Sequence, residues 1–398
     1  MVKADSRRSM STSAKSVEPA PRIQFAFSDE QDQFRSAVRR FLNDKSPTTE
    51  VRRLMANPEG YDPAMWRQLS TELGLPGIHV PERYGGAGFG MVELSIVMEE
   101  FGRALACAPY FSTAVLAANA IMNAGTEAQK SSLLPDIARG ARLATLAFTE
   151  LNGEWDPRAI QLVARPDADG YLLDGAKSYV VDGHLADLLI VAARLPSTAG
   201  LEGLALFTLA ANAGGVERRP LNSMDPTRKI ARIDFHGARA DLLGSLDDGA
   251  GPLIRTLDQA AIALANEMVG GAQKLFDSAL DYSKLRVQFG RTIGSFQAIK
   301  HKLADLLLDL ELARSAAYYA AQANAADDPE WPALASLAKA AASEMYLHTA
   351  AECIQIHGGI GFTWDNDTHL WFKRAKSSEV FFGQPSYHRE LLMQRWGV

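Results

Sequence analysis

One unbroken apolar stripe, between Leu253 and Leu285, limits the folds that this chain can adopt more than any other feature. Apolar residues recur there at positions 254, 257, 261, 264, 268, 272, 275, 279 and 282. These intervals of three and four residues predict one long helix with a buried apolar face. A single helix cannot bury such a face alone, so the fold needs further long helices packed beside it.

Further helical patterns follow this stripe. One runs from about Ser295 to Ala326 and is ended by "DDPEWP". The next runs from about Pro332 to His357 and stops at Gly358–Gly359, which is a helix C-cap signal. The remaining segment, 368–397, fits two shorter helices. We therefore predict a C-terminal four-helix bundle over residues 248–398.

The first part of the chain changes its pattern once. Residues 25–140 have helical spacing, and Ser28 followed by Gln31 predicts a capping box at the first helix. Residues 141–247 instead show short strands, beginning with a hairpin that turns at Asp167–Gly170 and continuing in "SYVVDG", "DLLIVAARL", "LALFTLA" and "IARIDFHG". The fold class is therefore mostly α with a β insert: an N-terminal α-helical domain, a middle antiparallel β-sandwich or barrel, and the bundle.

Composition excludes several classes of function. The net charge of −6 over 398 residues, with no basic stripe, argues against nucleic-acid binding. The only two cysteines, Cys107 and Cys353, cannot form a disulfide framework, which favours the cytoplasm. No run approaches 18 apolar residues, so no membrane span is expected. Residues 1–24, with five serines and two prolines, are expected to form a disordered tail.

The connection "RVQFGRTIGSFQ" (286–297) between the first two bundle helices carries the clearest chemical signal. Arg286 suits bidentate contact with phosphate oxygens. Phe289 and Phe296 offer rings for stacking, and Gln297 can recognise an amide or a purine edge. The alternative is an ordinary helix–helix turn with solvated arginines.

The segment "IQIHGGIGFTW" (354–364) is the second signal. Three glycines within four residues allow backbone N–H groups to approach a ligand closely. Helix termination alone would explain Gly358 but not Gly361. Neither segment is a G-x-G-x-x-G motif that opens a helix after a strand, so a Rossmann nucleotide site is not indicated. No metal site is predicted.

These two segments, together with "LADL" (303–306) and "VPERYGGAGFG" (80–90), give the chain a specific resemblance. Over residues 25–398 it resembles the acyl-CoA dehydrogenase family of flavoproteins. The resemblance implies a dimer of dimers, with FAD between the β-domain and the bundle and its adenine end reaching a neighbouring subunit. It also implies α,β-desaturation of an acyl-CoA in lipid catabolism such as β-oxidation, with hydride transfer to flavin N5 and electron-transfer flavoprotein as acceptor.

The resemblance assigns cofactor contacts residue by residue. Arg286 and Phe289 match the pyrophosphate and adenosine contacts, and Phe296 and Gln297 match adenine contacts. Gln355, Gly358 and Gly359 match a loop that closes over the nucleotide from the partner chain. The remaining cofactor positions implied by the resemblance are Phe148, Thr149, Tyr179, Val181 and Gln384.

Several of these positions depart from the family pattern. "TELNGEWDP" (149–157) keeps the family's Thr and Glu but has Trp155 in place of a Ser. "KSYVVDG" has Tyr179 for the usual Trp at the flavin ring and Val181 for a Thr whose hydroxyl lies near N5. These changes weaken the case for full dehydrogenase activity more than the case for FAD binding.

The catalytic base departs furthest. The family's usual Glu near the C-terminus aligns here with Phe382, which cannot accept a proton and which we place in the substrate pocket. Some relatives carry this Glu on the first bundle helix, where the equivalent here is Ala260; the Arg that usually follows is Ala261. The segment "SSEVFFGQPSYHRE" (377–390) thus has two aromatic rings where a carboxylate is expected.

Three carboxylates remain as candidates. Glu267 follows Ala260 by seven residues on nearly the same helix face, where burial would raise its pKa; the alternative is a Glu paired with Arg or His. Asp258 matches a family Asp that touches the pantetheine arm of CoA, so substrate binding is its expected role. Glu379 is expected to be solvated or ion-paired. His388 and Arg389 are expected on a solvated helix face.

Two functions remain open. The first is an FAD-dependent acyl-CoA dehydrogenase acting on a branched, aromatic or steroid-derived acyl chain, with its base at Glu267 or elsewhere. The second is a catalytically silent subunit that contributes FAD contacts within a heterotetramer. An acyl-CoA oxidase shares the fold but needs the same base.

Overall fold

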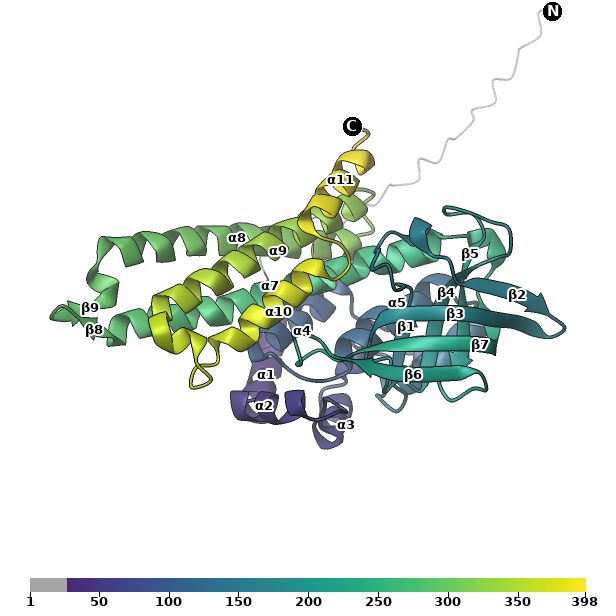
Figure 1. Cartoon of the computed structure of the whole chain (residues 1–398), viewed down its shortest axis with the longest axis horizontal. Coiled ribbons are helices and arrows are strands. Elements are labelled where there is room, and N and C mark those ends of the chain that lie inside the picture. The colour runs from purple at the N-terminus through teal and green to yellow at the C-terminus, as the bar shows by residue number, and fades with distance from the viewer. Residues whose placement is uncertain (1–26) are drawn as a thin grey trace, which may run out of the picture.

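The computed structural model describes residues 27–398, so the predicted tail at 1–24 lies outside the described residues. It confirms the predicted fold class: mostly helical, with a β region between two helical parts (Figure 1). The barrel lies at one end of the molecule, and the long bundle helices extend away from it (Figure 1).

The N-terminal helices enclose a continuous core with the bundle. The capping box at the start of α1 is confirmed, since Ser28 accepts from the Gln31 amide while the Gln31 side chain accepts from the Ser28 amide. A π-helix, η3 (Phe111–Ala118), follows a buried loop and is itself entirely buried. The elements of this part are α1 (Asp29–Lys45), α2 (Thr48–Ala56), α3 (Pro63–Thr71), η1 (Leu75–Gly77), η2 (Glu82–Tyr84), α4 (Met91–Ala104), η3, α5 (Asn119–Ala124) and α6 (Glu127–Ala138).

The β region is a barrel closed by five strands. Pairings run from β4 to β2, β3, β7 and β5 and return to β4, while β1 lies on β4 and β6 on β7. Two pairings, β1–β4 and β2–β4, are parallel, where the sequence predicted only antiparallel pairs. The strands are β1 (Ala144–Ala147), β2 (Val163–Asp167), β3 (Gly170–Val181), β4 (Leu188–Arg194), β5 (Leu204–Ala210), β6 (Val216–Leu221) and β7 (Ile230–Leu243), with short turns η4 (Pro157–Ala159) and η5 (Leu246–Asp248).

Strand β3 is longer than predicted. "YLLDG" and "SYVV" were expected as separate strands, but they form one strand from Gly170 to Val181. Its pairing with β7 shifts register after Leu173 and again between Lys177 and Val180. Tyr179 lies within the second irregularity with a positive φ of 59°, so a bulge turns this side chain out of the strand's regular alternation.

The C-terminal part is the predicted bundle around one central helix. Helix α7 (Gly251–Leu285) is buried over most of its length and packs against α4, α8 and α9. The other elements are α8 (Gln297–Ala325), α9 (Trp331–His357), α10 (Thr368–Val380) and α11 (Pro385–Arg395), with the hairpin β8 (Val287–Gln288) and β9 (Arg291–Thr292) and the short turns η6 (Ile293–Ser295) and η7 (Gly358–Phe362).

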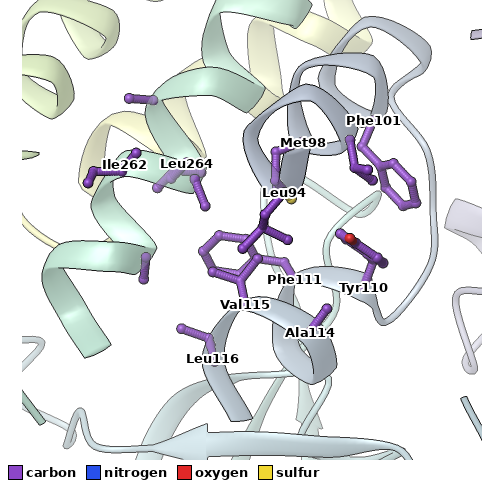
Figure 2. Close-up of a cluster of buried hydrophobic side chains, with 14 of the residues drawn as sticks. Leu94, Met98, Phe101, Tyr110, Phe111, Ala114, Val115, Leu116, Ile262 and Leu264 are labelled. Carbon is purple, nitrogen blue, oxygen red and sulfur yellow. The ribbon is translucent and has the colours of Figure 1, made fainter. Parts of the chain in front are cut away.

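Helices α4 and α7 cross with their backbones in contact. A Cβ atom on Gly102 would lie 1.9 Å from the Glu267 carbonyl oxygen, and one on Gly270 would lie 1.8 Å from the Glu99 carbonyl oxygen. Only glycine fits at either position. Beside this crossing, side chains of α4, η3 and α7 form a dense apolar core, which includes Leu94, Met98, Phe111 and Leu264 (Figure 2).

His79 provides a pH test of the N-terminal core. Burial lowers the pKa of His79 to about 4, partly offset by Asn119. Because the unfolded chain protonates this ring near pH 6.5, its contribution to stability should be lost as the pH falls from 6.5 towards 4, by about 3 kcal/mol. His79→Leu should therefore reduce the pH dependence of unfolding in urea over this window.

Leu75→Ala is the control, because Leu75 is a fully buried side chain of the same core without a titratable group, so this change should lower stability without altering its pH dependence. Identical pH profiles for the wild type and His79→Leu would contradict the assignment.

Candidate functional site

The hairpin at the far end of the bundle presents the first predicted motif to solvent (Figure 1). Phe289 and Gly290 form its two-residue turn, with φ angles of 52° and 76°, and Phe289 is 92% exposed. Arg291 stacks on Phe296 with its guanidinium 4.0 Å from the ring centre. A positive φ at an exposed, bulky residue is costly, and such strain tends to occur at functional sites.

Arg286 lies at the base of this hairpin. Its backbone caps α7 through the Tyr282 carbonyl, while its guanidinium is exposed and has no ion pair within the described residues. Gln297 is also exposed, at the first turn of α8. These side chains are therefore free to bind an anionic ligand, as the sequence predicts.

The glycine segment lies at the same end of the bundle. The rings of Tyr282 and His357 stack 4.6 Å apart and so join the C-terminal ends of α7 and α9. Gly358 ends α9 with a φ of 66°, which confirms the predicted C-cap, and a Cβ at Gly358 or Gly359 would meet no atom within 4 Å. The backbone there is open, as close approach by a ligand requires, and Gln355 is exposed beside it.

The β-domain positions lie together at the barrel rim. Thr149 is buried and donates its hydroxyl to the Ser178 carbonyl at 2.9 Å. Lys177 donates to the Phe148 carbonyl at 2.9 Å and to Glu150 at 2.8 Å, and burial lowers the pKa of Lys177 to about 8. The segment after β1 is therefore fixed against β3, next to Tyr179 and Val181.

Five aromatic rings fill the position where the sequence expects the base. We call Phe111, Phe148, Trp155, Phe381 and Phe382 the aromatic cluster. The Phe382 ring lies at its centre, with ring centres 5.4 Å from Trp155, 5.6 Å from Phe111 and 5.7 Å from Phe148. Phe382 is buried, so the two rings of the C-terminal segment face the barrel and η3. No proton acceptor lies among the cluster's side chains.

Glu267 is held in a buried ion network beside the cluster. Both of its oxygens accept from Arg228, at 2.6 and 2.5 Å, and one also accepts from Arg374 at 2.5 Å. Although burial opposes charge on Arg374, Asp225 and Glu267 raise its pKa above the usual range. Two guanidinium groups thus bind the Glu267 carboxylate. This agrees with the alternative of a Glu paired with Arg, and it argues against Glu267 as the catalytic base.

The Arg228 guanidinium also links the network to the cluster. It lies 5.4 Å from the Phe111 ring centre and 5.6 Å from that of Phe381. A cavity of about 30 Å³, which has room for a water molecule, adjoins Arg228, Glu267 and Arg374. Acyl chains cannot enter a space of this size.

Asp258 has a different environment. Both oxygens accept from Arg395 on α11 at 2.8 Å, and burial, opposed by Arg395, raises the pKa of Asp258 to about 6. A cavity of about 210 Å³, lined by both residues and by Arg158 and Tyr387, opens beside it. Asp258 therefore lies at the edge of a partly polar cavity, but its carboxylate is already paired.

Other predicted residues are dispersed. Glu379 pairs with Lys376, Arg389 pairs with Glu344 on the surface, and Gln384 is exposed at the start of α11. The expectation for His388 was wrong, because it is buried and bonded to the Phe382 carbonyl at 2.9 Å. Ala260 and Ala261 are buried within α7 and supply no functional group.

Sequence reasoning missed three important side chains, Arg228, Lys339 and Arg374. Lys339 interrupts a run of apolar and small residues from Pro332 to Ser343, which could have marked it as a buried cation. The two arginines carry no such signal.

Comparison with known proteins identifies the family. Residues 28–141 match the family model "Acyl-CoA dehydrogenase, N-terminal domain", and residues 247–397 match "Acyl-CoA dehydrogenase, C-terminal domain". The chain is 34% identical over 364 residues to acyl-CoA dehydrogenase IpdE2 of Mycobacterium tuberculosis. The aligned region covers 92% of this chain and 95% of that protein. The chain belongs to the acyl-CoA dehydrogenase family. This confirms the predicted family and its oxidoreductase class.

Two solved structures resemble this acyl-CoA dehydrogenase over nearly all of its length. One is a variant of the Tcur3481-Tcur3483 steroid ACAD, with a TM-score of 0.84, 31% identity and coverage of 93% of this chain and 98% of that chain. The other is the ChsE4-ChsE5 complex of Mycobacterium tuberculosis, with a TM-score of 0.85, 26% identity and coverage of 94% and 99%.

Two further findings concern the cysteines and the absence of a membrane-spanning helix among the described residues. Cys107 and Cys353 are both free and buried. Among the described residues, no helix combines the length and apolar character needed to cross a bilayer.

Proposed function

We propose that this acyl-CoA dehydrogenase works as one of two kinds of subunit, contributing contacts to FAD while a partner chain supplies the catalytic base. The observation that carries the proposal is the buried Phe382 ring, which occupies the base position within the aromatic cluster. A phenyl ring cannot abstract the α-proton of an acyl-CoA. The other standard base position, Ala260, is equally inert.

The residues that the resemblance assigns to the cofactor are chemically suited to bind FAD. FAD, when bound, supplies the hydride acceptor for α,β-desaturation. Arg286 offers an exposed, unpaired guanidinium for its pyrophosphate, and the open backbone at Gly359 allows close approach. The Phe289 ring stands almost wholly in solvent, which suits stacking on an adenine from a neighbouring subunit. The hairpin beside these groups lies at the end of the bundle away from the barrel (Figure 1), where a neighbouring subunit's cofactor can reach it.

The similar structures support a mixed assembly. One is the ChsE4-ChsE5 complex, and the other is the Tcur3481-Tcur3483 steroid ACAD. We propose the same arrangement here, a heterotetramer with a base-bearing paralogue, and a bulky acyl-CoA such as a steroid-derived thioester as the substrate of the assembly. The expected electron acceptor is electron-transfer flavoprotein, and the expected compartment is the cytoplasm.

A self-contained FAD-dependent dehydrogenase is the second candidate. The observation that favours it is Asp258, a buried carboxyl whose pKa is raised to about 6 beside the 210 Å³ cavity. Its bidentate pairing with Arg395 counts against a role as base. A homotetramer would then be the active form.

Bleaching of the flavin spectrum by acyl-CoA separates the two candidate functions. The chain purified alone should leave its visible spectrum unchanged when acyl-CoA thioesters of several shapes are added. Co-expressed with a related chain that carries the usual Glu, the assembly should be yellow and should bleach with substrate. Bleaching of the isolated chain by any acyl-CoA would contradict the silent subunit and support the second candidate.

Arg286→Ala in this chain tests its share of the cofactor site. In the co-expressed assembly, the affinity for FAD should fall by about 10- to 100-fold, because a charge-assisted hydrogen bond contributes about 1.5–3 kcal/mol. Fluorescence titration of the apoprotein with FAD measures this. Arg389→Ala, which removes another exposed arginine, is the control and should bind FAD normally.

A further inference from the structure

The turn that carries Phe382 is strained. Phe382 has a φ of 60°, in the left-handed region that is unfavourable for a non-glycine residue. Gly383 follows with a φ of 107°, and a Cβ there would lie 2.3 Å from the Tyr387 ring. Such a backbone persists only when its surroundings hold it.

Lys339 lies directly behind this turn. It is fully buried in the middle of α9, and its ammonium donates to the Gly383 carbonyl at 3.0 Å, to the Glu379 carbonyl at 3.3 Å and to the Ser343 hydroxyl at 2.9 Å. No carboxylate forms an ion pair with it within the described residues. A buried amine without a counter-ion depends on its hydrogen bonds. Lys339 makes two of its three bonds to backbone carbonyls at the two ends of this turn, and so it holds the turn in place.

His388 holds the adjoining carbonyl. Its Nε2 lies 2.9 Å from the Phe382 carbonyl oxygen, and burial lowers the pKa of His388 to about 3, so the neutral ring can donate this bond. The carbonyls of Phe382 and Gly383 thus each have a buried side-chain donor, one from α11 and one from α9. The backbone that follows the Phe382 ring is thereby fixed, and the bond from Lys339 to the Glu379 carbonyl holds the segment before it.

We infer that Lys339 and His388 are positioning residues that hold the Phe382 ring against Trp155 and so keep an acyl thioester out of the space between the barrel and the bundle. Neither side chain forms a ring contact with Phe382; both act through the turn. The inference rests on the proposed function, since it explains why this subunit's own acyl site is shut. With the donors removed, the turn relaxes, the Phe382 ring leaves Trp155, and the space between barrel and bundle opens.

The test uses the full chain without partner. Lys339→Met keeps the length and apolar packing of the side chain but removes its donors. We expect acrylamide quenching of Trp155 fluorescence to rise by about twofold as the ring gains solvent contact, and octanoyl-CoA to quench it further in a saturable manner. Both changes should vanish when Trp155→Phe is added, which assigns the signal among the chain's six tryptophans.

Two comparisons keep the result interpretable. His388→Leu should reproduce the opening, while His388→Gln, which can still donate to the Phe382 carbonyl, should largely retain the closed state. Leu306→Ala removes a buried side chain elsewhere in the bundle, on α8, and should lower stability without exposing Trp155.

The inference is overturned if Lys339→Met leaves Trp155 as protected as in the wild type, or if Leu306→Ala exposes it equally. These readouts contain no flavin. Failure of the proposed function, which is measured by bleaching of the flavin with acyl-CoA, is therefore seen separately.

Discussion

Glu267→Gln should lower the free energy of unfolding by about 3–5 kcal/mol, because it leaves the buried Arg228 without its counter-charge and removes one of the two carboxylate partners of Arg374. The substitution keeps the shape of the side chain, so cavity formation does not contribute. Arg228 would lose both of its carboxylate bonds, and Arg374 would keep only Asp225 and Thr227. Urea denaturation of the isolated chain measures the effect.

Glu344→Gln is the matched control, since Glu344 also pairs with an arginine but lies on the surface. Its effect should stay below about 1 kcal/mol, as is usual for exposed pairs. If Glu267 were instead the base, Glu267→Gln would abolish turnover in an active assembly and leave stability nearly unchanged, which is the opposite pattern.

Gly270→Ala should destabilise the fold by about 3 kcal/mol or more, because the added methyl group meets backbone rather than a movable side chain. The Glu99 carbonyl oxygen would lie 1.8 Å from the new Cβ, so α4 and α7 would have to separate along their crossing. Since α7 also supports the bundle core, the loss should appear as a lower unfolding midpoint in thermal and urea denaturation alike.

Gly251→Ala on the same helix provides the comparison. A Cβ there meets no atom within 4 Å, so this change should be neutral or stabilise slightly through the better helix propensity of alanine. Equal effects of the two substitutions would refute the close crossing.

The helical parts of this acyl-CoA dehydrogenase were predictable because their signals are local. The apolar stripe of α7, the capping box at Ser28 and the C-cap at Gly358 each depend on residues within a few turns of one another. Ring closure of the barrel was not predictable in detail, since the parallel pairing of β1 with β4 joins segments far apart in the chain. The sequence indicated a break between "YLLDG" and "SYVV", but β3 continues through it and pairs with β7 on both sides of the irregularity at Tyr179.

The site divides in the same way. Motif resemblance predicted nucleotide contacts at residues that the structure leaves exposed, and it predicted that Phe382 takes the place of the usual base. It could not supply the partners of Phe382, because Phe111 and Trp155 come from the helical domain and the barrel respectively. For Glu267 the burial followed from the helix stripe, but Arg228 and Arg374 lie 39 and 107 residues away. Pairing at such distances depends on tertiary packing alone.

The exposed aromatic rings at the end of the bundle affect the solubility of the isolated chain. Phe289 and Phe362 are 92% and 81% exposed, and Leu307, Leu308 and Leu312 add further apolar surface along α8. Apolar surface of this kind promotes self-association when nothing covers it. The isolated chain should therefore self-associate increasingly as its concentration is raised, and any chain that covers this surface should raise the soluble yield.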